Sequence, residues 1–491
     1  MYCNMKKVIE SVKREKIIIV IDKNDKKVFS NGTLLEMAKE FSQKFSILEG
    51  EVCCIYISDI FSQLVAFWGT ILAGGVPVLV QYEDELLSSP STKFLSAIKS
   101  CKSNYYIILL NGSFVLKDSK SDLYQHKNLD FDFIQLSSGS TGTPKAIKMY
   151  WSSIESNIAI NKDYFSKLGI DIQGVSLNWL RLDHVVPIVT MHIYDIALGN
   201  DQVIVETSHA LKHPEVICKA IEYYKVKRTW SPNFGVKMLS KFLERSNYDF
   251  DLSSLNIYLN AGEQVTHEAM KHMVKSGKRH ALNPQSLFSS FGMAELSTIV
   301  SNSQWYYSNR HDNFVSCGSL LNGLDVKITN KDMFGVGELY FKSKDLLNGE
   351  RYYLNENSNH ESYDRENGWF KTGDLAFMKS GELYICGREK EVIIAKAEKI
   401  YPHIIEEMIN NFYGLRTACV PIFNSSKGSN DIGIVVEGER HNVVDKEIVN
   451  KIKEEAGVTI RKIISVENKM FLVTTSGKVK RSEMSKYFEG T

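Results

Sequence analysis

A short loop rich in hydroxyl groups and glycine, LSSGSTGTPK, occupies residues 136–145 at the end of an apolar segment. Its candidate anion-binding residues are Ser137, Ser138, Gly139, Ser140, Thr141, Gly142 and Lys145. Glycine lets a loop turn several backbone N–H groups toward one anion, and the hydroxyl and ammonium groups add donors and positive charge. The loop therefore predicts a phosphate-binding site at the end of a strand. Its spacing differs from that of the Walker loop, in which Gly directly precedes Lys, so a P-loop fold is disfavoured.

Apolar segments of strand length alternate with amphipathic segments of helix length along the chain. Strands are predicted near residues 16–22, 52–57, 77–80 and 255–259, and helices at 33–45, 60–73, 151–165 and 216–224. This alternation predicts βαβ units around a mainly parallel sheet, and therefore the α/β fold class. Residues 318–342 contain short strand patterns separated by glycine turns, which predicts a small β-rich subdomain. The polar stretch 345–367 predicts a long loop.

The composition is that of an ordinary globular enzyme. With 491 residues, the chain is longer than most single cores, so two or more domains are expected. The formal net charge of +1 gives no electrostatic reason to expect binding to nucleic acid or to a membrane. The eight cysteines include no Cys-x-x-Cys pair, and the polar N-terminus lacks the apolar core of a signal peptide, so a cytoplasmic location is expected. Glycines and a proline interrupt the apolar run 64–80, which favours buried elements over a membrane span.

Five further motifs follow the loop in a fixed order. They are NAGE at 260–263, SSFGMAE at 289–295, WFKTGDLA at 369–376, CGREKEVI at 386–393 and TTSGKVKR at 474–481. Each resembles a motif of the adenylate-forming superfamily, and the six together span nearly the whole chain in family order. This superfamily includes acyl-CoA synthetases, fatty acyl-AMP ligases, adenylation domains of nonribosomal peptide synthetases, and luciferases.

The resemblance implies a nucleotide site with ATP and Mg²⁺ as cofactors. The residues that it assigns to ATP or AMP are the loop residues above together with Ala261, Gly262, Glu263, Phe291, Gly292, Asp374 and Arg388. Phe291 stands where the family usually has Tyr, and it keeps a flat face for stacking on adenine. Asp374 resembles the carboxylate that binds the ribose hydroxyls. Glu295 and Thr141 are the expected Mg²⁺ ligands, and they act in catalysis with Lys478.

A second set of residues is implied to line the acyl pocket. His184 follows WLRLD, and Asn233 and Phe234 belong to a Pro-Asn-Phe sequence of the kind found in the fatty acyl-AMP ligase and polyketide-loading branch. Met293 completes this set. Amino-acid-activating members place an aspartate near His184 to hold the substrate ammonium group. Asp183 is one residue away, so an amino acid substrate stays open.

The resemblance also implies two domains and a two-step reaction. Residues 1–388 would form the N-terminal domain, and residues 389–491 a mobile α/β domain that carries Lys478 and swings about Lys390. ATP and a carboxylic acid would give acyl-AMP and pyrophosphate, and the acyl group would pass to a phosphopantetheine thiol. A separate acyl or peptidyl carrier protein is the expected partner, because the sequence stops at Thr491 and leaves no room for a fused carrier.

Three alternatives remain for the function. The acceptor could be coenzyme A, as in an acyl-CoA synthetase, or the substrate could be an amino acid. The third alternative is a non-catalytic nucleotide-binding scaffold on the same fold. Two departures from the family bear on these. Ala397 stands where the family has a glycine beside the pantetheine path, and the sequence 472–474 replaces the usual Pro-Lys-Thr before the catalytic lysine.

Overall fold

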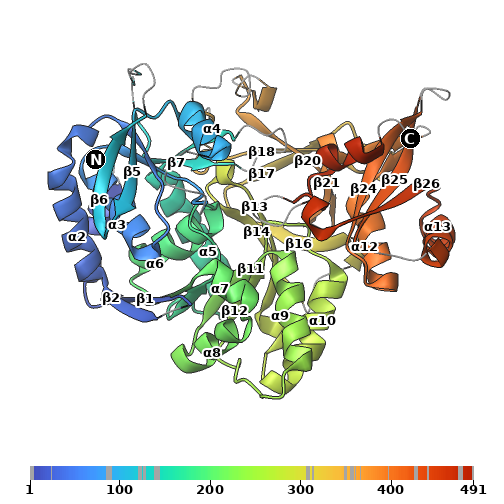
Figure 1. The fold of residues 1–491 in the computed structure, drawn as a ribbon, viewed down its shortest axis with the longest axis horizontal. Helices are drawn as coiled ribbons and strands as arrows, with labels where there is room; N and C mark the ends of the chain where they lie inside the picture. The colour runs from blue at the N-terminus through green and yellow to red at the C-terminus, as the bar shows by residue number, and fades with distance from the viewer. Residues whose placement is uncertain are drawn as a thin grey trace.

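The structure is a computed structural model that describes most of the chain. The described residues are 5–23, 25–83, 91–119, 124, 126, 129–137, 144–305, 310–311, 314–347, 351–353, 359, 361–364, 366–395, 398–424, 429–438, 442–473 and 479–488. The predicted α/β class is confirmed, because helices cover sheets that contain runs of parallel strands. Figure 1 places the N-terminal part, in blue, and the last lobe, in orange and red, at opposite ends of the molecule.

The first sheet contains the strands on either side of the predicted anion-binding loop, residues 136–145 (the anion loop). Its six strands run in the order β6-β5-β3-β4-β7-β8. They are β3 (Val52–Ile55), β4 (Val76–Leu79), β5 (Tyr105–Leu110), β6 (Ser113–Asp118), β7 (Phe133–Leu136) and β8 (Ala146–Met149). The pairs among β5, β3, β4 and β7 are parallel, whereas β6 and β8 pair antiparallel with β5 and β7. The anion loop therefore joins the two strands of an antiparallel hairpin at one edge of the sheet.

The second sheet is long and continuous, in the order β17-β18-β20-β21-β16-β14-β13-β12-β11-β9-β10-β1-β2. Its parallel part contains β1 (Ile17–Ile21), β9 (Ser176–Asn178), β10 (Gln202–Val205), β11 (Arg228–Ser231), β12 (Ile257–Asn260) and β13 (Leu287–Gly292). The antiparallel strands are β2 (Lys26–Ser30), β14 (Ile299–Gln304), β16 (Phe314–Leu320), β17 (Asp325–Thr329), β18 (Gly337–Lys342), β20 (Trp369–Lys379) and β21 (Glu382–Arg388). Short strands β15 (Arg310–His311) and β19 (Tyr363–Asp364) pair with β16 and β20. The predicted β-rich region thus extends the parallel sheet through β14 and β16.

Helices pack on these two sheets. They are α1 (Met5–Glu10), α2 (Asn31–Lys44), α3 (Ile60–Leu72), α4 (Thr92–Cys101), α5 (Trp151–Lys167), α6 (Tyr194–Leu198), α7 (Thr207–Lys212), α8 (Glu215–Tyr224), α9 (Asn233–Arg245) and α10 (His267–Gly277). A π-helix, η2 (Val186–Ile193), runs directly into α6. Shorter turns are η1 (Ser46–Leu48), η3 (Lys278–His280), η4 (Pro284–Ser286) and η5 (Ala294–Leu296). The predicted helices at 33–45, 60–73, 151–165 and 216–224 all form, with ends that differ by one or two residues.

Side-chain caps explain where several of these helices begin. The Ser30 hydroxyl accepts a hydrogen bond from the Thr33 N–H at the start of α2. The Asp59 carboxylate accepts from the Ser62 N–H at the start of α3. Such caps satisfy N–H groups that have no partner inside the helix.

Helix α3 is apolar on nearly every side and lies buried in the core. Among the described residues, no helix has both the length and the apolar character of a membrane span.

The last part of the chain forms a lobe with its own sheet. Strands β24 (Thr417–Asn424), β25 (Ser429–Glu437) and β26 (Ile460–Val466) form the sheet, and α12 (Pro402–Tyr413), α13 (Asn442–Ala456) and α14 (Arg481–Met484) accompany it. A hairpin of β22 (Ile393–Ala395) and β23 (Glu398–Ile400) follows η7 (Glu389–Glu391). The turns η8 (Asn468–Met470) and η9 (Ser485–Phe488) complete the elements. Separate buried clusters support this lobe, which agrees with the predicted strand and helix patterns there.

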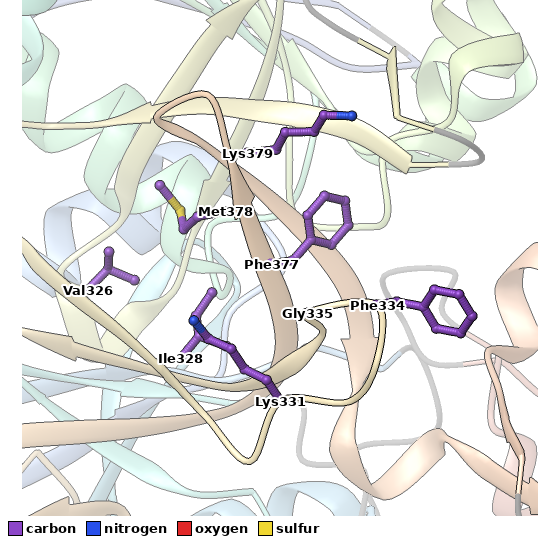
Figure 2. A pocket seen from close by; sticks show the side chains of 8 residues that line it. All are labelled: Val326, Ile328, Lys331, Phe334, Gly335, Phe377, Met378 and Lys379. Carbon is purple, nitrogen blue, oxygen red and sulfur yellow. The ribbon is translucent and has the colours of Figure 1, made fainter.

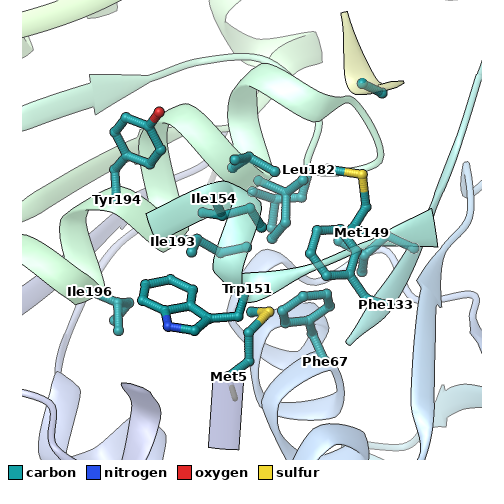
Figure 3. Packing of buried hydrophobic residues seen from close by; sticks show 14 of the residues in the cluster. Met5, Phe67, Phe133, Met149, Trp151, Ile154, Leu182, Ile193, Tyr194 and Ile196 are labelled. Carbon is teal, nitrogen blue, oxygen red and sulfur yellow. The ribbon is translucent and has the colours of Figure 1, made fainter. Parts of the chain in front are cut away.

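The hairpin that carries the anion loop rests on the largest buried cluster. Figure 3 shows Phe133 of β7 and Met149 of β8 beside Phe67 of α3 and Trp151 at the start of α5. The Phe133 ring meets the Phe67 ring edge-on, with 5.3 Å between centroids. Leu182, close before His184 in sequence, packs into the same cluster. The core therefore fixes the base of the loop and the His184 segment together.

A buried histidine links helix α3 to the second sheet. His192 of η2 accepts a hydrogen bond from the Trp68 indole N–H of α3 at Nε2, with 2.8 Å between the nitrogens. Its Nδ1 lies 2.8 Å from the side-chain oxygen of Gln202 on β10. The ring must therefore be neutral, with its proton on Nδ1. Burial lowers the pKa of His192 to about 4, although Gln202 acts in the opposite direction.

Replacing Phe133 by alanine should destabilise the protein strongly. The side chain is only 2% exposed, so its removal leaves a cavity in the cluster of Figure 3. We expect a loss of about 3–5 kcal/mol in the free energy of unfolding. The measurement is urea denaturation followed by tryptophan fluorescence. Phe334→Ala is the matched control, because Phe334 is 79% exposed, and equal shifts in the two variants would contradict the packing described here.

His192 should make stability depend on pH. An unfolded histidine has a pKa near 6.5, and the folded value is about 4, so the unfolded chain binds more protons between these values. The stabilisation is complete above pH 6.5 and is lost as the pH falls toward 4, by on the order of 3 kcal/mol. Urea midpoints at pH 7 and 4.5 measure the effect. His192→Gln should lose less stability than the wild type between pH 7 and pH 4.5. If the variant and the wild type lost the same amount, the pH dependence would not come from His192.

Candidate nucleotide site

The two ends of the anion loop are held together by hydrogen bonds. The Ser137 N–H donates to the Lys145 carbonyl at 2.9 Å, and the Lys145 N–H donates to the Ser137 hydroxyl at 3.2 Å. These bonds continue the β7–β8 pairing, in which Leu136 faces Ala146. The predicted residues Ser138, Gly139, Ser140, Thr141 and Gly142 lie outside the described residues. The structure therefore locates the mouth of the loop at the end of the hairpin.

Lys145 and Glu295 meet on opposite parts of one tyrosine. The Lys145 ammonium lies 4.4 Å from the centroid of the Tyr352 ring, and the Tyr352 hydroxyl donates to the Glu295 carboxylate at 2.8 Å. Glu295 and Tyr352 are 8% and 6% exposed. Burial lowers the pKa of Lys145, whereas Glu295 acts to raise it. Burial and the Glu295 charge both raise the pKa of the Tyr352 hydroxyl, so it stays a hydrogen-bond donor.

Tyr352 was not predicted as a site residue, because it lies in the stretch expected to be a long loop. That expectation is wrong for two short pieces, since β19 forms at 363–364 and residues 351–353 pair with β8. The Lys148 N–H donates to the Arg351 carbonyl at 2.7 Å, and the Tyr353 N–H donates to the Ala146 carbonyl at 2.8 Å. The adjacent aromatic residues Tyr352 and Tyr353, unusual in a polar loop, are the signal that the sequence offers.

A tight turn between β13 and β14 presents the candidate adenine and metal residues. The strand register shifts between Phe291 and Gly292, and the Met293 N–H donates to the Thr298 carbonyl at 3.0 Å. A Cβ on Gly292 would lie 2.2 Å from the Thr298 carbonyl oxygen, so only glycine fits without a shift. The Phe291 ring stacks on Phe341 with 6.2 Å between centroids, and Met293 is buried. The turn thus brings Phe291, Met293 and Glu295 to one place.

Asp374 and Arg388 face each other across β20 and β21. Arg388 Nε lies 2.9 Å from Asp374 Oδ1, and its guanidinium also donates to the Thr372 carbonyl at 3.2 Å. Asp374 is buried, whereas the Arg388 side chain is half exposed. Asp374 raises the pKa of Arg388. The negative charge of Glu295 also raises the pKa of Arg388, and the positive charge of Arg388 lowers the pKa of Lys145. These charged groups therefore share one region.

The NAGE segment contacts the start of α9. The Glu263 carboxylate accepts a hydrogen bond from the Phe234 N–H at 2.9 Å, and thereby caps that helix. The Asn233 side-chain oxygen accepts from the Thr266 N–H and from the Asn260 side chain, each at 3.1 Å. Ala261 is buried beside them, and Gly262 has φ +82°, a conformation that favours glycine. Asn233 and Glu263 therefore shape the local backbone, whatever further contacts they make.

The remaining candidate acyl residues are His184, in a segment that contacts β7, and Phe234, beside Trp179. The Gln135 side chain on β7 donates to the Asp183 carbonyl at 2.6 Å, so the His184 segment is tied to the residue two before Ser137. The Phe234 ring meets the Trp179 ring edge-on, with 6.0 Å between centroids. The Asp183 carboxylate pairs with Arg181. Burial acts to raise the pKa of Asp183, but the charges of His184 and Arg181 outweigh it and hold this pKa below its usual value.

The predicted hinge residue and the predicted catalytic lysine both lie in the last part of the sequence. Lys390 is exposed within η7, directly after Arg388 and Glu389. Lys478 lies outside the described residues, but an isolated bridge between Val473 and Val479 closes the segment that contains it. Arg481, three residues later, pairs with Glu391 at 2.6 Å and with Glu406 at 2.6 and 2.8 Å.

A hollow elsewhere on the surface is separate from these residues. Figure 2 shows it between β17, the turn before β18, and the end of β20, with a volume of about 270 Å³. Phe334 and Phe377 contribute rings, and Lys331 and Lys379 flank it. None of the predicted site residues that the structure describes lines this hollow. It is therefore a different feature from the candidate nucleotide site.

No group of three or more His, Cys, Asp or Glu side chains within the described residues could hold a metal ion by itself. A Mg²⁺ ion at Glu295 would therefore depend on oxygens from elsewhere. Mg²⁺ is commonly bound by one or two carboxylates together with substrate phosphates and water. The buried Glu295, beside Lys145 and the anion loop, fits this mode of binding.

Comparison with known proteins agrees with the family resemblance. Residues 110–353 match the family model described as AMP-binding enzyme. The nonribosomal peptide synthetase pngA of Aspergillus terreus (strain NIH 2624 / FGSC A1156) is 25% identical over 512 residues, which cover 94% of this chain and 53% of pngA. This chain thus spans about half the length of that relative.

Two solved structures have the same fold over nearly the whole chain. One is McyG A-PCP complexed with phenylalanyl-adenylate, with a TM-score of 0.85 and 24% identity over 100% of this chain and 96% of the other. The second is a structure of fatty acyl-adenylate ligases from E. coli and L. pneumophila, with a TM-score of 0.82 and 18% identity over 99% and 98%. At these identities the likeness establishes the fold.

Gly292→Ala should damage the turn that carries Glu295. The added Cβ would contact the Thr298 carbonyl oxygen and would lie 2.7 Å from the Ile299 Cα, so backbone must move. We expect a loss of about 1–3 kcal/mol in the free energy of unfolding, measured by urea denaturation.

Ser297→Gly is the matched control in the same turn. Ser297 has φ +71°, and its buried hydroxyl has no hydrogen-bond partner among the described residues. Glycine removes both costs, so stability should stay equal or rise by up to about 1 kcal/mol. If both variants lost stability equally, the steric account of Gly292 would be wrong.

Proposed function

Residues 110–353 of this chain match the AMP-binding enzyme family, and from this match we propose that the chain activates a carboxylic acid with ATP. A carboxylate oxygen would attack the α-phosphorus of ATP, the bond to the β-phosphate oxygen would break, and acyl-AMP and pyrophosphate would form. The observation that carries this proposal is the gathering of Lys145, Glu295, Asp374 and Arg388 around the mouth of the anion loop. Two cations and two carboxylates from distant parts of the chain suit a magnesium nucleotide.

Each side chain has a proposed role in binding ATP. Phe291 would stack on adenine, and Asp374 would accept hydrogen bonds from the ribose hydroxyls. Lys145 and the loop donors would hold the phosphates, and Glu295 with Thr141 would hold Mg²⁺, which neutralises phosphate charge when bound. The reacting carboxylate is already an anion, so no general base is required. The main obstacle is the approach of two anions, which positioned cations reduce.

Lys478 would supply a further cation at the α-phosphate. The bridge between Val473 and Val479 brings together the two residues on either side of the segment 474–478, and the neighbouring Arg481 is anchored by two glutamates. These contacts support a lysine loop with a firm base. Rotation of the last lobe about Lys390 would withdraw Lys478 after the first step and admit a thiol to the acyl-AMP.

The thiol acceptor is proposed to be the phosphopantetheine of a separate acyl or peptidyl carrier protein, with coenzyme A as the alternative. The Trp179–His184 and Pro-Asn-Phe sequences support the carrier-loading branch. Ala397, which bears on the thiol path, lies outside the described residues. A direct comparison of coenzyme A with a purified carrier as acceptor would distinguish these two alternatives.

The contacts of Asp183 bear on the amino acid alternative. In that alternative, Asp183 would receive the ammonium group of the substrate. Its two carboxylate oxygens instead accept hydrogen bonds from Arg181, from Nε to Oδ1 at 2.9 Å and from Nη2 to Oδ2 at 2.5 Å. A substrate ammonium would have to displace this bidentate pair, which is among the stronger hydrogen-bonded arrangements in proteins. The pair therefore supports a substrate acid without an α-ammonium group.

Acid-dependent exchange between ATP and labelled pyrophosphate tests the proposal. The substrate panel should contain carboxylic acids, each paired with its 2-amino counterpart. We expect exchange with at least one acid that lacks the amino group. Lys478→Ala should reduce this exchange by about 100-fold or more, with ATP affinity largely kept, because the lysine would act mainly on the transition state.

Lys480→Ala is the control for that variant. Lys480 is two residues further along and pairs with Glu483 on the surface, so its loss should leave exchange within about twofold of the wild type. Absence of exchange with every acid would favour the non-catalytic scaffold. Preference for the amino members of the panel would instead favour the amino-acid-activating alternative.

A further inference from the structure

Tyr352 is held in place by contacts on both sides of its backbone. Residue 352 forms an antiparallel bridge with Ile147 on β8. On its other side, the Tyr352 N–H donates to the Asn359 side-chain oxygen at 3.0 Å, and the Asn359 side-chain N–H donates to the Tyr352 carbonyl at 2.9 Å. The backbone at this residue is therefore fixed between the anion-loop hairpin and the following segment.

The preceding residue, Arg351, anchors the same segment to helix α5 and to Leu346. Its side chain is 1% exposed, and its guanidinium donates to the Ser153 hydroxyl of α5 at 3.1 Å and to the Leu346 carbonyl. The guanidinium also lies 5.0 Å from the centroid of the Tyr150 ring. A buried arginine with several partners resists displacement, because each partner would have to be lost with it. Tyr352 is therefore presented on a rigid support.

The Tyr352 side chain contacts two groups of opposite charge at once. Its hydroxyl donates to Glu295, and its ring supports the Lys145 ammonium. Lys145 and Glu295 do not form an ion pair within 4.0 Å in the described part of the chain. In a partly buried site, an opposite-charge pair of this kind would attract strongly if the groups were free to approach. The tyrosine gives each charge a separate contact instead.

We propose that Tyr352 is a positioning residue for ATP and Mg²⁺, which orients Glu295 toward the metal and keeps Lys145 from pairing with it. This inference rests on the proposed function, because it assigns Glu295 to Mg²⁺ and Lys145 to phosphate. A hydrogen bond to a carboxylate fixes its direction, and a cation over an aromatic face is held without being neutralised. Both charges thus remain available to the nucleotide. The hydroxyl and the ring have separable tasks.

Two substitutions separate these tasks. Tyr352→Phe keeps the ring beneath Lys145 and removes the hydrogen bond to Glu295, whereas Tyr352→Leu removes both. Tyr353→Phe is the matched control, because Tyr353 is adjacent and its hydroxyl lies 2.6 Å from His126 Nδ1. Tyr353 also packs in a different buried cluster from Tyr352. All three variants should first be compared with the wild type by urea denaturation.

The main measurement is ATP binding by calorimetry, with Mg²⁺ and with EDTA, in the absence of any acid. Tyr352→Phe should raise the Mg²⁺ concentration needed for tight ATP binding by about tenfold, with affinity in EDTA unchanged. Tyr352→Leu should in addition weaken binding in EDTA, since Lys145 could then pair with Glu295. Tyr353→Phe should stay within about twofold of the wild type in both conditions.

The outcomes separate this inference from the proposed function. Equal Mg²⁺ dependence in Tyr352→Phe and Tyr353→Phe would overturn the role of the hydroxyl. Equal affinity in EDTA for Tyr352→Leu and Tyr352→Phe would overturn the role of the ring. If the wild type neither bound ATP nor supported exchange with any acid, the proposed function itself would fail. If Tyr352→Leu unfolds, Tyr352→Phe still tests the role of the hydroxyl, because it keeps the ring and its packing in the buried cluster.

Discussion

The pairing of β7 with β8 is the constraint on which the site depends. These are short strands, and the loop between them can bind an anion only if its two ends stay together. Hydrogen bonds between Ser137 and Lys145 close the mouth, and Phe133 and Met149 anchor the strands in the largest core cluster. Residues 351–353 then cover the free edge of β8. The two ends of the loop are thus held on a base that the core and a third segment make rigid.

The charges of the site follow from this arrangement. Asp374 and Arg388 pair across two strands, which gives the guanidinium a fixed direction at modest cost because one partner is half exposed. Lys145 and Glu295, by contrast, do not pair with each other. Each contacts Tyr352, so neither charge neutralises the other. A site for a magnesium nucleotide needs both a cation for phosphate and a carboxylate for metal. Separating those two groups is therefore as necessary as bringing them together.

Local patterns in the sequence were sufficient for much of this structure. Helices at 33–45 and 60–73 were predictable because their apolar residues recur with helical spacing, and the strands near 52–57 and 77–80 because they are short and apolar. The motifs also predicted Glu295, Asp374 and Arg388 as members of one site, and the structure brings these charges into one region. The α/β class followed from the alternation of the two kinds of segment.

What could not be predicted depends on contacts between distant residues. Tyr352 reaches Glu295 across 57 positions, and Arg351 reaches Lys148 across 203. A polar stretch with many Asn and Glu residues gives no local signal that three of its residues will cover a strand edge. The pairing of Arg181 with Asp183 is local, but its meaning depends on where the segment lies. The continuity of the long sheet through β14 and β16 was hidden for the same reason.

The contacts of the last lobe bear on its proposed movement. Arg481, Glu391 and Glu406 all follow Lys390, so rotation about that residue would carry this half-buried ionic cluster as one unit. The Lys399–Asp332 pair joins the lobe to the larger part, but it is partly exposed and 3.6 Å long. Exposed pairs of this kind contribute about 0.2–1 kcal/mol. Tyr401 and His403 of the lobe also contact the Phe314 ring of the larger part, with 6.0 Å between centroids in each pair. Rotation about Lys390 would therefore have to separate these rings as well as the exposed ion pair, and the ring contacts are the larger part of that cost.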